Sequence, residues 1–155
     1  MINIGAQCTF LKASDELRRA LQAAGCKTRY SPSQTLFREE ESNSGVYLLL
    51  RGKLRMTVHG LPNLDRLFSV GSVLGLPSTF TGHPYSLTAQ AVTEADVIHI
   101  PADRFLKVMR DQPELCREAT EMLGREVTFI QSALAERRKQ AATAKISPAE
   151  IGALV

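Results

Sequence analysis

The pattern of apolar and polar residues divides the chain into a short helical start, a strand-rich centre and a long helical end. A serine and two acidic residues at 14–16 precede apolar residues at helical spacing, and Gly25 ends the pattern, which predicts a capped amphipathic helix. From about residue 28 to residue 101, short apolar runs alternate with turns rich in glycine, proline, serine and asparagine. This order predicts an antiparallel barrel or jelly roll, a mainly β fold with flanking helices.

The strand-rich centre contains seven runs that we expect to be strands, at 27–30, 35–37, 46–50, 53–58, 64–70, 86–92 and 95–100. Arg51 and Gly52 separate the third run from the fourth. Because a turn this short that contains glycine commonly joins paired strands, the sequence predicts a hairpin there.

The stretch between Gly71 and Ala91 interrupts the strand pattern. It predicts a strand that breaks at Gly75 into a one-turn helix starting near Pro77. The backbone amides of Ser78 and Thr79 would then point at whatever the following loop encloses, since the first amides of a helix lack partners within it. This stretch is therefore where we look for a ligand.

A single long helix is predicted from Pro113 to about Ala142. Its apolar stripe is too wide for one partner surface, so one side can cover the barrel and the other can pair with the same helix of a second chain. A helix packed wholly on its own domain is the simpler alternative. We favour the dimer because a helix of this length, at ~1.5 Å per residue, overruns a small barrel. The residues assigned to the dimer helix are Ala119, Met122, Leu123, Glu126, Val127, Ile130 and Leu134.

Length and charge limit the functional classes. The chain has 155 residues, enough for one domain, and its 19 basic and 16 acidic residues leave a net charge of +3, too mild to argue for nucleic acid. The basic residues at 137–139 are interpreted as a solvated helix end. No run is apolar enough to cross a membrane and no signal peptide is evident, so we expect a cytoplasmic protein without a membrane partner.

The cysteines and histidines do not form a recognisable site. Three of each are scattered along the chain, without a CxxC or HxH pattern, so we expect no metal and no disulfide framework. A cupin-like enzyme would need a metal triad or a nucleophile–base pair, and neither is found, so we expect no catalytic residues and no enzyme. A haem sensor that uses His83 or Cys116 is a narrower alternative.

The order of these motifs resembles the effector domain of the Crp/Fnr family of bacterial regulators, and cyclic-nucleotide-binding domains generally. The resemblance implies a jelly-roll barrel with flanking helices, a phosphate-binding cassette at 71–91 and dimerisation through the long helix. It implies an N-terminal helical segment at 1–25, the barrel at 26–112, the dimerisation helix at 113–142 and a tail at 143–155. The residues that carry the resemblance are 33–37, 47–55, 68–75, 91–101, Phe105 and 111–115.

The cassette departs from the family pattern at two positions. In cyclic-nucleotide binders a carboxylate after the second glycine accepts the ribose hydroxyl, and an arginine pairs with the cyclic phosphate. Here those positions hold Leu76, which cannot accept a hydrogen bond, and Tyr85, which offers one neutral donor. We therefore do not expect cyclic AMP or cyclic GMP in its usual pose. The expected cassette residues are Gly71, Val73, Leu74, Gly75, Leu76, Ser78, Thr79, Tyr85, Ser86 and Leu87.

The resemblance leaves two functions open. The first is a dimeric ligand-sensing or regulatory domain that binds a different small ligand. The second is an interaction module whose pocket is filled by its own side chains and which pairs with a full-length regulator. Crp/Fnr regulators continue into a helix-turn-helix, whereas this sequence ends at Val155, soon after the apolar stripe, with a short capped turn at most at 146–151. We therefore expect no sequence-specific DNA binding by this chain alone.

Overall fold

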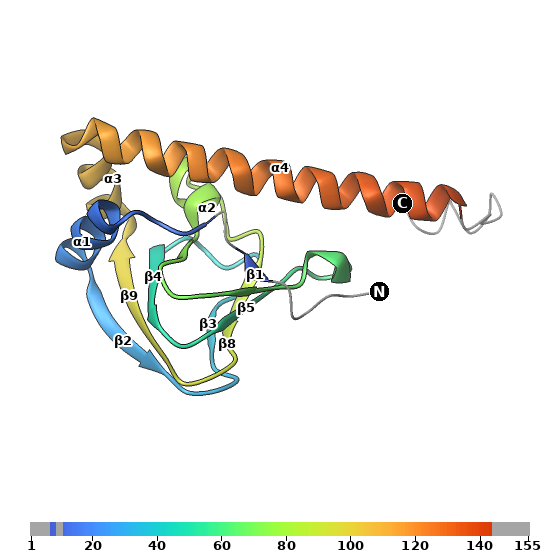
Figure 1. Cartoon of the computed structure of the whole chain (residues 1–155), viewed down its shortest axis with the longest axis horizontal. Helices are drawn as coiled ribbons and strands as arrows, with labels where there is room; N and C mark the ends of the chain where they lie inside the picture. Colours follow the sequence, from blue (N-terminus) through green and yellow to red (C-terminus); the bar gives the residue numbers. More distant parts are fainter. Residues whose placement is uncertain (1–6, 9–10, 144–155) are drawn as a thin grey trace.

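The computed structural model describes residues 7–8 and 11–143 and shows two β-sheets packed face to face, with helices along one side (Figure 1). Neighbouring strands are antiparallel except for β1 and β6, which pair in parallel. One sheet has the order β1 (Gln7–Cys8), β6 (Arg66–Phe68), β5 (Leu54–Thr57), β8 (Thr88–Ala91) and β3 (Thr35–Phe37). The other has the order β2 (Cys26–Tyr30), β9 (Ala95–Pro101), β4 (Gly45–Arg51) and β7 (Val73–Leu74). This arrangement confirms the predicted mainly β jelly-roll barrel with flanking helices.

The core lies between the two sheets and extends beneath the helices. Phe37 and Leu54 come from one sheet, Leu48 comes from the other, and Phe105 comes from a flanking helix; all four are fully buried. Each side chain of this size stabilises the fold by about 1.5–3 kcal/mol when it leaves water. The core therefore fixes how the sheets and helices sit around the cassette.

The helices agree with the expected ends. Helix α1 (Asp15–Ala24) is capped by Ser14, whose hydroxyl oxygen accepts a hydrogen bond of 3.2 Å from the Leu17 amide. Helix α3 (Ala102–Asp111) and helix α4 (Pro113–Thr143) follow the barrel, and α4 runs across it and projects past its edge (Figure 1). Within the part of the chain that the structure describes, no helix is long and apolar enough to cross a bilayer.

The predicted hairpin at Arg51 and Gly52 is wrong. Strand β4 pairs with β7 and β9, whereas β5 pairs with β6 and β8, so the turn carries the chain from one sheet to the other. Gly52 has φ +95°, and a Cβ there would lie 2.3 Å from the carbonyl oxygen of Glu94. The glycine is needed because two segments cross closely at this corner, and it does not mark a pairing of adjacent strands.

Some expected elements are shorter than predicted. The run at 64–70 begins as the 3₁₀ helix η1 (Pro62–Leu64) and continues as β6, and the run at 86–92 is a strand only in β8. The expected turn at 146–151 lies outside the described residues, and the four-segment domain division stays a prediction.

Candidate functional site

The backbone of the cassette, residues 71–91, has the predicted change from strand to short helix. Strand β7 ends at Leu74, Gly75 adopts a left-handed conformation with φ +91°, and helix α2 (Leu76–Thr81) starts directly after it. A Cβ on Gly75 would lie 3.0 Å from the carbonyl oxygen of Gly45, so the glycine is required both by its φ and by a close neighbour. The strand-to-helix break predicted at Gly75 is confirmed.

The amides at the start of α2 are not all directed at a pocket. The amide of Thr79 donates a hydrogen bond of 3.0 Å to the carbonyl oxygen of Gly75 and so belongs to the helix ladder. The expectation that this amide is available for an anion is wrong, because α2 starts one residue earlier than predicted. Helix geometry pairs each amide with the carbonyl four residues before it, and that carbonyl is Gly75.

The hydroxyl groups of α2 are also occupied. Ser78 and Thr79 are both buried, and the side-chain amide of Asn43 donates to their oxygens at 2.7 Å and 3.0 Å. The Ser78 hydroxyl in turn donates to the backbone carbonyl of His83, in the loop that follows α2. These bonds tie α2 to the turn before β4, so both hydroxyls stabilise the cassette's own conformation.

Tyr85 occupies the position where the family pattern has arginine, and its side chain points into the barrel. It is 3% exposed, and its hydroxyl donates a hydrogen bond of 2.8 Å to the carbonyl oxygen of Gly45. The phenolic oxygen of Tyr85 also accepts a bond of 3.1 Å from the Ser44 amide, and the Tyr85 ring stacks on Phe37 with 4.1 Å between the ring centroids. The tyrosine therefore serves as a wall of the barrel.

The remaining cassette residues divide between the core and the surface. Leu76 is 1% exposed and belongs to the main core, together with Leu87 and the β7 residues Val73 and Leu74. Ser86 is exposed. Gly71 lies at the other end of β7, where its carbonyl oxygen accepts a bond from the Ala13 amide. The structure thus brings Gly75, Leu76, Ser78, Thr79 and Tyr85 together, and it places Gly71 and Ser86 elsewhere.

Sequence reasoning missed a row of rings beside the cassette. Phe37 lies between Tyr85 and Tyr47, with a centroid distance of 5.3 Å to Tyr47, and His99 lies 4.8 Å beyond Tyr47. Burial is the main cause that raises the pKa of Tyr47 to about 12, so the phenol is neutral. No local pattern in the sequence signals this row, because Phe37 on β3 and Tyr47 on β4 come from different sheets and meet only in the folded barrel.

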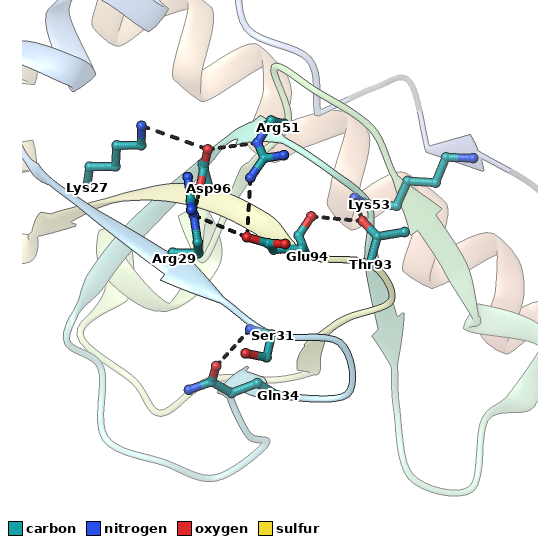
Figure 2. Close-up of polar contacts among 9 residues, drawn as sticks. All are labelled: Lys27, Arg29, Ser31, Gln34, Arg51, Lys53, Thr93, Glu94 and Asp96. Carbon is teal, nitrogen blue, oxygen red and sulfur yellow. Dashed lines mark hydrogen bonds and ion pairs between the residues drawn. The ribbon is translucent and has the colours of Figure 1, made fainter.

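A second missed feature is a charge network on the outer face of β2, β9 and β4 (Figure 2). The carboxylate of Asp96 is nearly buried and accepts hydrogen bonds of 2.9 Å from the guanidinium groups of both Arg29 and Arg51. The ammonium nitrogen of Lys27 lies 3.8 Å from an oxygen of the Asp96 carboxylate. The bonds from Arg51 and Arg29 hold the pKa of the Asp96 carboxyl well below its usual range. This network ties the three strands together.

The expected residues of the dimer helix lie on two adjacent faces of α4. Ala119, Met122 and Glu126 are buried on the chain's own barrel, together with Leu115 and Ala133. Beside them runs a partly exposed line that we call the outer stripe, whose most exposed member is Val127, at 41%. The outer stripe consists of Leu123, Val127, Ile130 and Leu134.

The candidate haem ligands show no built site. His83 is exposed in the loop after α2, and Cys116 is half-buried near the start of α4. Among residues 7–8 and 11–143, no three histidine, cysteine, aspartate or glutamate side chains gather closely enough to hold a metal ion.

Comparison with known proteins adds one family match. The family model described as "Cyclic nucleotide-binding domain" matches residues 27–112, which include all of β2 but its first residue, the strands from β3 to β9, the cassette and α3. Patatin-like phospholipase domain-containing protein 7 from Mus musculus is 20% identical over 127 residues, which are 80% of this chain and 9% of that protein.

Two solved structures have a similar fold. The catabolite activator protein of Thermus thermophilus superposes with a TM-score of 0.69 at 19% identity, over 83% of this chain and 62% of that one. Oxidised CprK in complex with o-chlorophenolacetic acid gives a TM-score of 0.67 at 14% identity, over 86% of this chain and 56% of that one. At these identities the likeness concerns the fold alone, and this chain spans only part of each of the two proteins.

Proposed function

Because the chain belongs to the cyclic nucleotide-binding domain family, we propose that it is a regulatory domain of the Crp/Fnr type that acts as a dimer without binding cyclic AMP or cyclic GMP in the usual pose. The proposal has three parts: a closed cassette, a second chain on α4, and an output that is regulatory and not enzymatic. A cytoplasmic location remains part of the prediction.

The observation that carries the proposal is the environment of Tyr85. A phosphate-binding arginine at this position would present two parallel donors to the anion, whereas the Tyr85 hydroxyl is already bonded to the carbonyl oxygen of Gly45. Leu76, at the position of the ribose-binding carboxylate, is buried in the core. Each charge-assisted bond is worth about 1.5–3 kcal/mol, so losing two weakens binding by roughly 10²–10⁴-fold.

The dimer proposal is supported by the outer stripe. Its four residues, at 123, 127, 130 and 134, follow the alternating spacing of four and three that is typical of a helix–helix seam. The barrel covers the adjacent face of α4, through Ala119 and Met122, and leaves Val127 exposed. A second copy of α4 placed in parallel would bury the stripe of both chains against each other.

A different small ligand and a purely structural pocket both remain compatible with the closed cassette. A different small ligand is supported by one protein of similar fold, CprK, which was solved in complex with o-chlorophenolacetic acid. The filled positions of Leu76 and Tyr85 favour the second candidate, an interaction module that pairs through α4 with a full-length regulator. In that case the chain would form mixed dimers with that regulator.

Light scattering on the purified chain tests the proposal. A mass of twice the chain at micromolar concentration is expected, and a monomer at high micromolar concentration would contradict the dimer. Native mass spectrometry followed by a thermal-shift screen of nucleotides and acidic metabolites separates the two candidates, because only the sensing domain should gain stability from a ligand.

A further inference from the structure

Helix α4 contacts the rest of the chain in its first part, near α1 and α3, and again in its second part, near η1. In its first part, Leu115, Ala119 and Met122 belong to the main core, and the carboxylate of Glu118 accepts bonds of 2.7 Å and 2.6 Å from the Ser14 amide and hydroxyl. These contacts anchor residues 113–122. They combine buried apolar side chains with two hydrogen bonds to the N-cap residue of α1.

The second contact lies at the edge of that core, against which the ring of Phe129 is partly buried. Helix η1 packs against α4, and the side-chain amide of Asn63 donates a hydrogen bond of 2.8 Å to the carbonyl oxygen of Ala133. The guanidinium of Arg66 lies over the ring of Phe129, 4.9 Å from its centroid. In the second part of α4 these two contacts act together with the partly buried ring of Phe129 and the small buried side chain of Ala133.

Glu126 lies between the two contacts, on the face of α4 that the barrel covers. Its side chain is 2% exposed, and its Oε2 atom has no hydrogen-bond partner among the described residues. An ionised carboxylate in such a place is costly, because it has left water without gaining a compensating partner. Burial accordingly raises the pKa of Glu126 to about 7.

The charged groups on the neighbouring elements are engaged elsewhere or exposed. Asp65, after η1, accepts a bond of 2.6 Å from Arg55, and Arg66 donates to the backbone carbonyls of Asn63 and Asp65. Helix α2 carries no charged residue, and His83 after it is exposed. The charged side chains of α3, which packs on the first part of α4, are all exposed: Asp103, Arg104, Lys107, Arg110 and Asp111. On α4 itself, Glu118 is bonded to Ser14, and Glu121 and Arg125 are exposed.

Gly124 marks a weak point in α4, two residues before Glu126. It is exposed, and a Cβ there would meet no atom within 4 Å, so close packing does not require a glycine. Glycine inside a helix costs roughly 1 kcal/mol relative to alanine, because it releases more backbone freedom when the helix opens. The glycine therefore separates the anchored first part of α4 from the part that carries Glu126.

We propose that the protonated Glu126 side chain holds residues 126–134 of α4 on the barrel, and that its ionisation releases this part of the helix about Gly124. Release brings the carboxylate into water and breaks the bond between Asn63 and Ala133 and the contact between Arg66 and Phe129. We call this pH-dependent attachment of residues 126–134 the latch. The latch goes beyond the proposed regulatory function, because it needs neither a ligand nor a second chain. It makes the position of the long helix depend on pH near neutrality.

Hydrogen exchange of the complete chain tests the latch. Amide protection of 126–134 is compared with that of 113–122 at about pH 6 and about pH 8, after correction for the intrinsic exchange rate. In the wild type the relative protection of 126–134 should fall at least several-fold at the higher pH. Glu126→Gln should keep the relative protection of 126–134 at both pH values. Glu136→Gln, which removes an exposed charge further along α4, should behave as the wild type. Equal pH dependence in Glu126→Gln and the wild type, or none in the wild type, would overturn the latch.

A second measurement avoids any folding defect of the variant. Carbon-13 NMR follows the side-chain carboxyl of Glu126 in the wild-type chain during a pH titration. The latch requires a midpoint near neutral pH, and a midpoint in the ordinary range of an exposed glutamate, about 4.3, would exclude it. Neither measurement depends on a nucleotide, so failure of the latch leaves the proposed function standing.

Discussion

The hydroxyl of Tyr85 donates a hydrogen bond of 2.8 Å to the carbonyl oxygen of Gly45, inside the barrel and 40 residues away along the chain. This bond joins the end of the cassette to the first residue of β4. It uses the side chain that, in the family pattern, would be an arginine facing a phosphate. Closure of the cassette is therefore part of the fold's own stability.

Tyr85→Phe should lower the free energy of unfolding by about 1–3 kcal/mol, because it leaves the Gly45 carbonyl without the phenolic donor and the Ser44 amide without its acceptor. Urea unfolding followed by circular dichroism measures the change. Tyr30→Phe, which alters a half-buried tyrosine on β2, is the matched control and should cost less. No loss in Tyr85→Phe would mean that the bond does not stabilise the barrel.

Gly45→Ala should be more damaging than Gly82→Ala, although both glycines have positive φ, +133° and +76°. A Cβ on Gly45 would lie 2.0 Å from the carbonyl oxygen of Ile100, whereas a Cβ on Gly82 meets nothing within 4 Å. We expect Gly82→Ala to lower the free energy of unfolding by about 1 kcal/mol, from the backbone conformation alone, and Gly45→Ala to lower it by at least about 3 kcal/mol. Thermal melts of the two variants side by side give the comparison, and equal losses would contradict it.

Much of this architecture follows from the sequence. The Gly75 break, the capped helix after Ser14 and the long helix from Pro113 are local patterns, and the structure has all three. The partners of Tyr85 could not be predicted, because Gly45 is brought to it only by the folded barrel. The hairpin at Gly52 failed for the same reason: a short glycine turn fixes the direction of the chain, but not which strand pairs with the next.

Val127→Glu should weaken the dimer, because the symmetric pairing of α4 would place two unpaired carboxylates in an apolar seam. We expect a rise of about tenfold or more in the dissociation constant, measured by analytical ultracentrifugation. Ser132→Glu adds the same charge to an exposed position on another face of α4 and should leave the dimer intact. If both variants associate as the wild type does, the outer stripe is not the interface.

The free energy of unfolding should depend on pH through the ionisation of Glu126. Since burial raises the pKa of Glu126 in the folded protein to about 7 from an ordinary value of 4.5, the folded state keeps a proton that the unfolded chain loses between these pH values. That group's contribution therefore destabilises the fold progressively from pH 4.5 to about 7, by up to about 3 kcal/mol, and then levels off.

A glutamine at position 126 in Glu126→Gln has no proton to lose on unfolding. The free energy of unfolding of this variant should therefore rise relative to that of the wild type across the same pH interval, and the difference should stay constant above it. Urea unfolding at a series of pH values gives the difference in free energy between the two proteins. The exposed Glu136→Gln should show no such trend. A difference that does not change with pH would show that Glu126 titrates as an exposed glutamate does.

Calorimetric titration of the wild-type chain with cyclic AMP and with cyclic GMP tests the central claim most directly. The closed cassette predicts heats equal to those of dilution, with no saturation up to about 1 mM nucleotide, a limit equivalent to about −4 kcal/mol of binding free energy. A saturable isotherm with one nucleotide per chain and a dissociation constant on the order of micromolar would contradict it. Such a result would show that the buried side chains of Leu76 and Tyr85 move aside to admit the nucleotide.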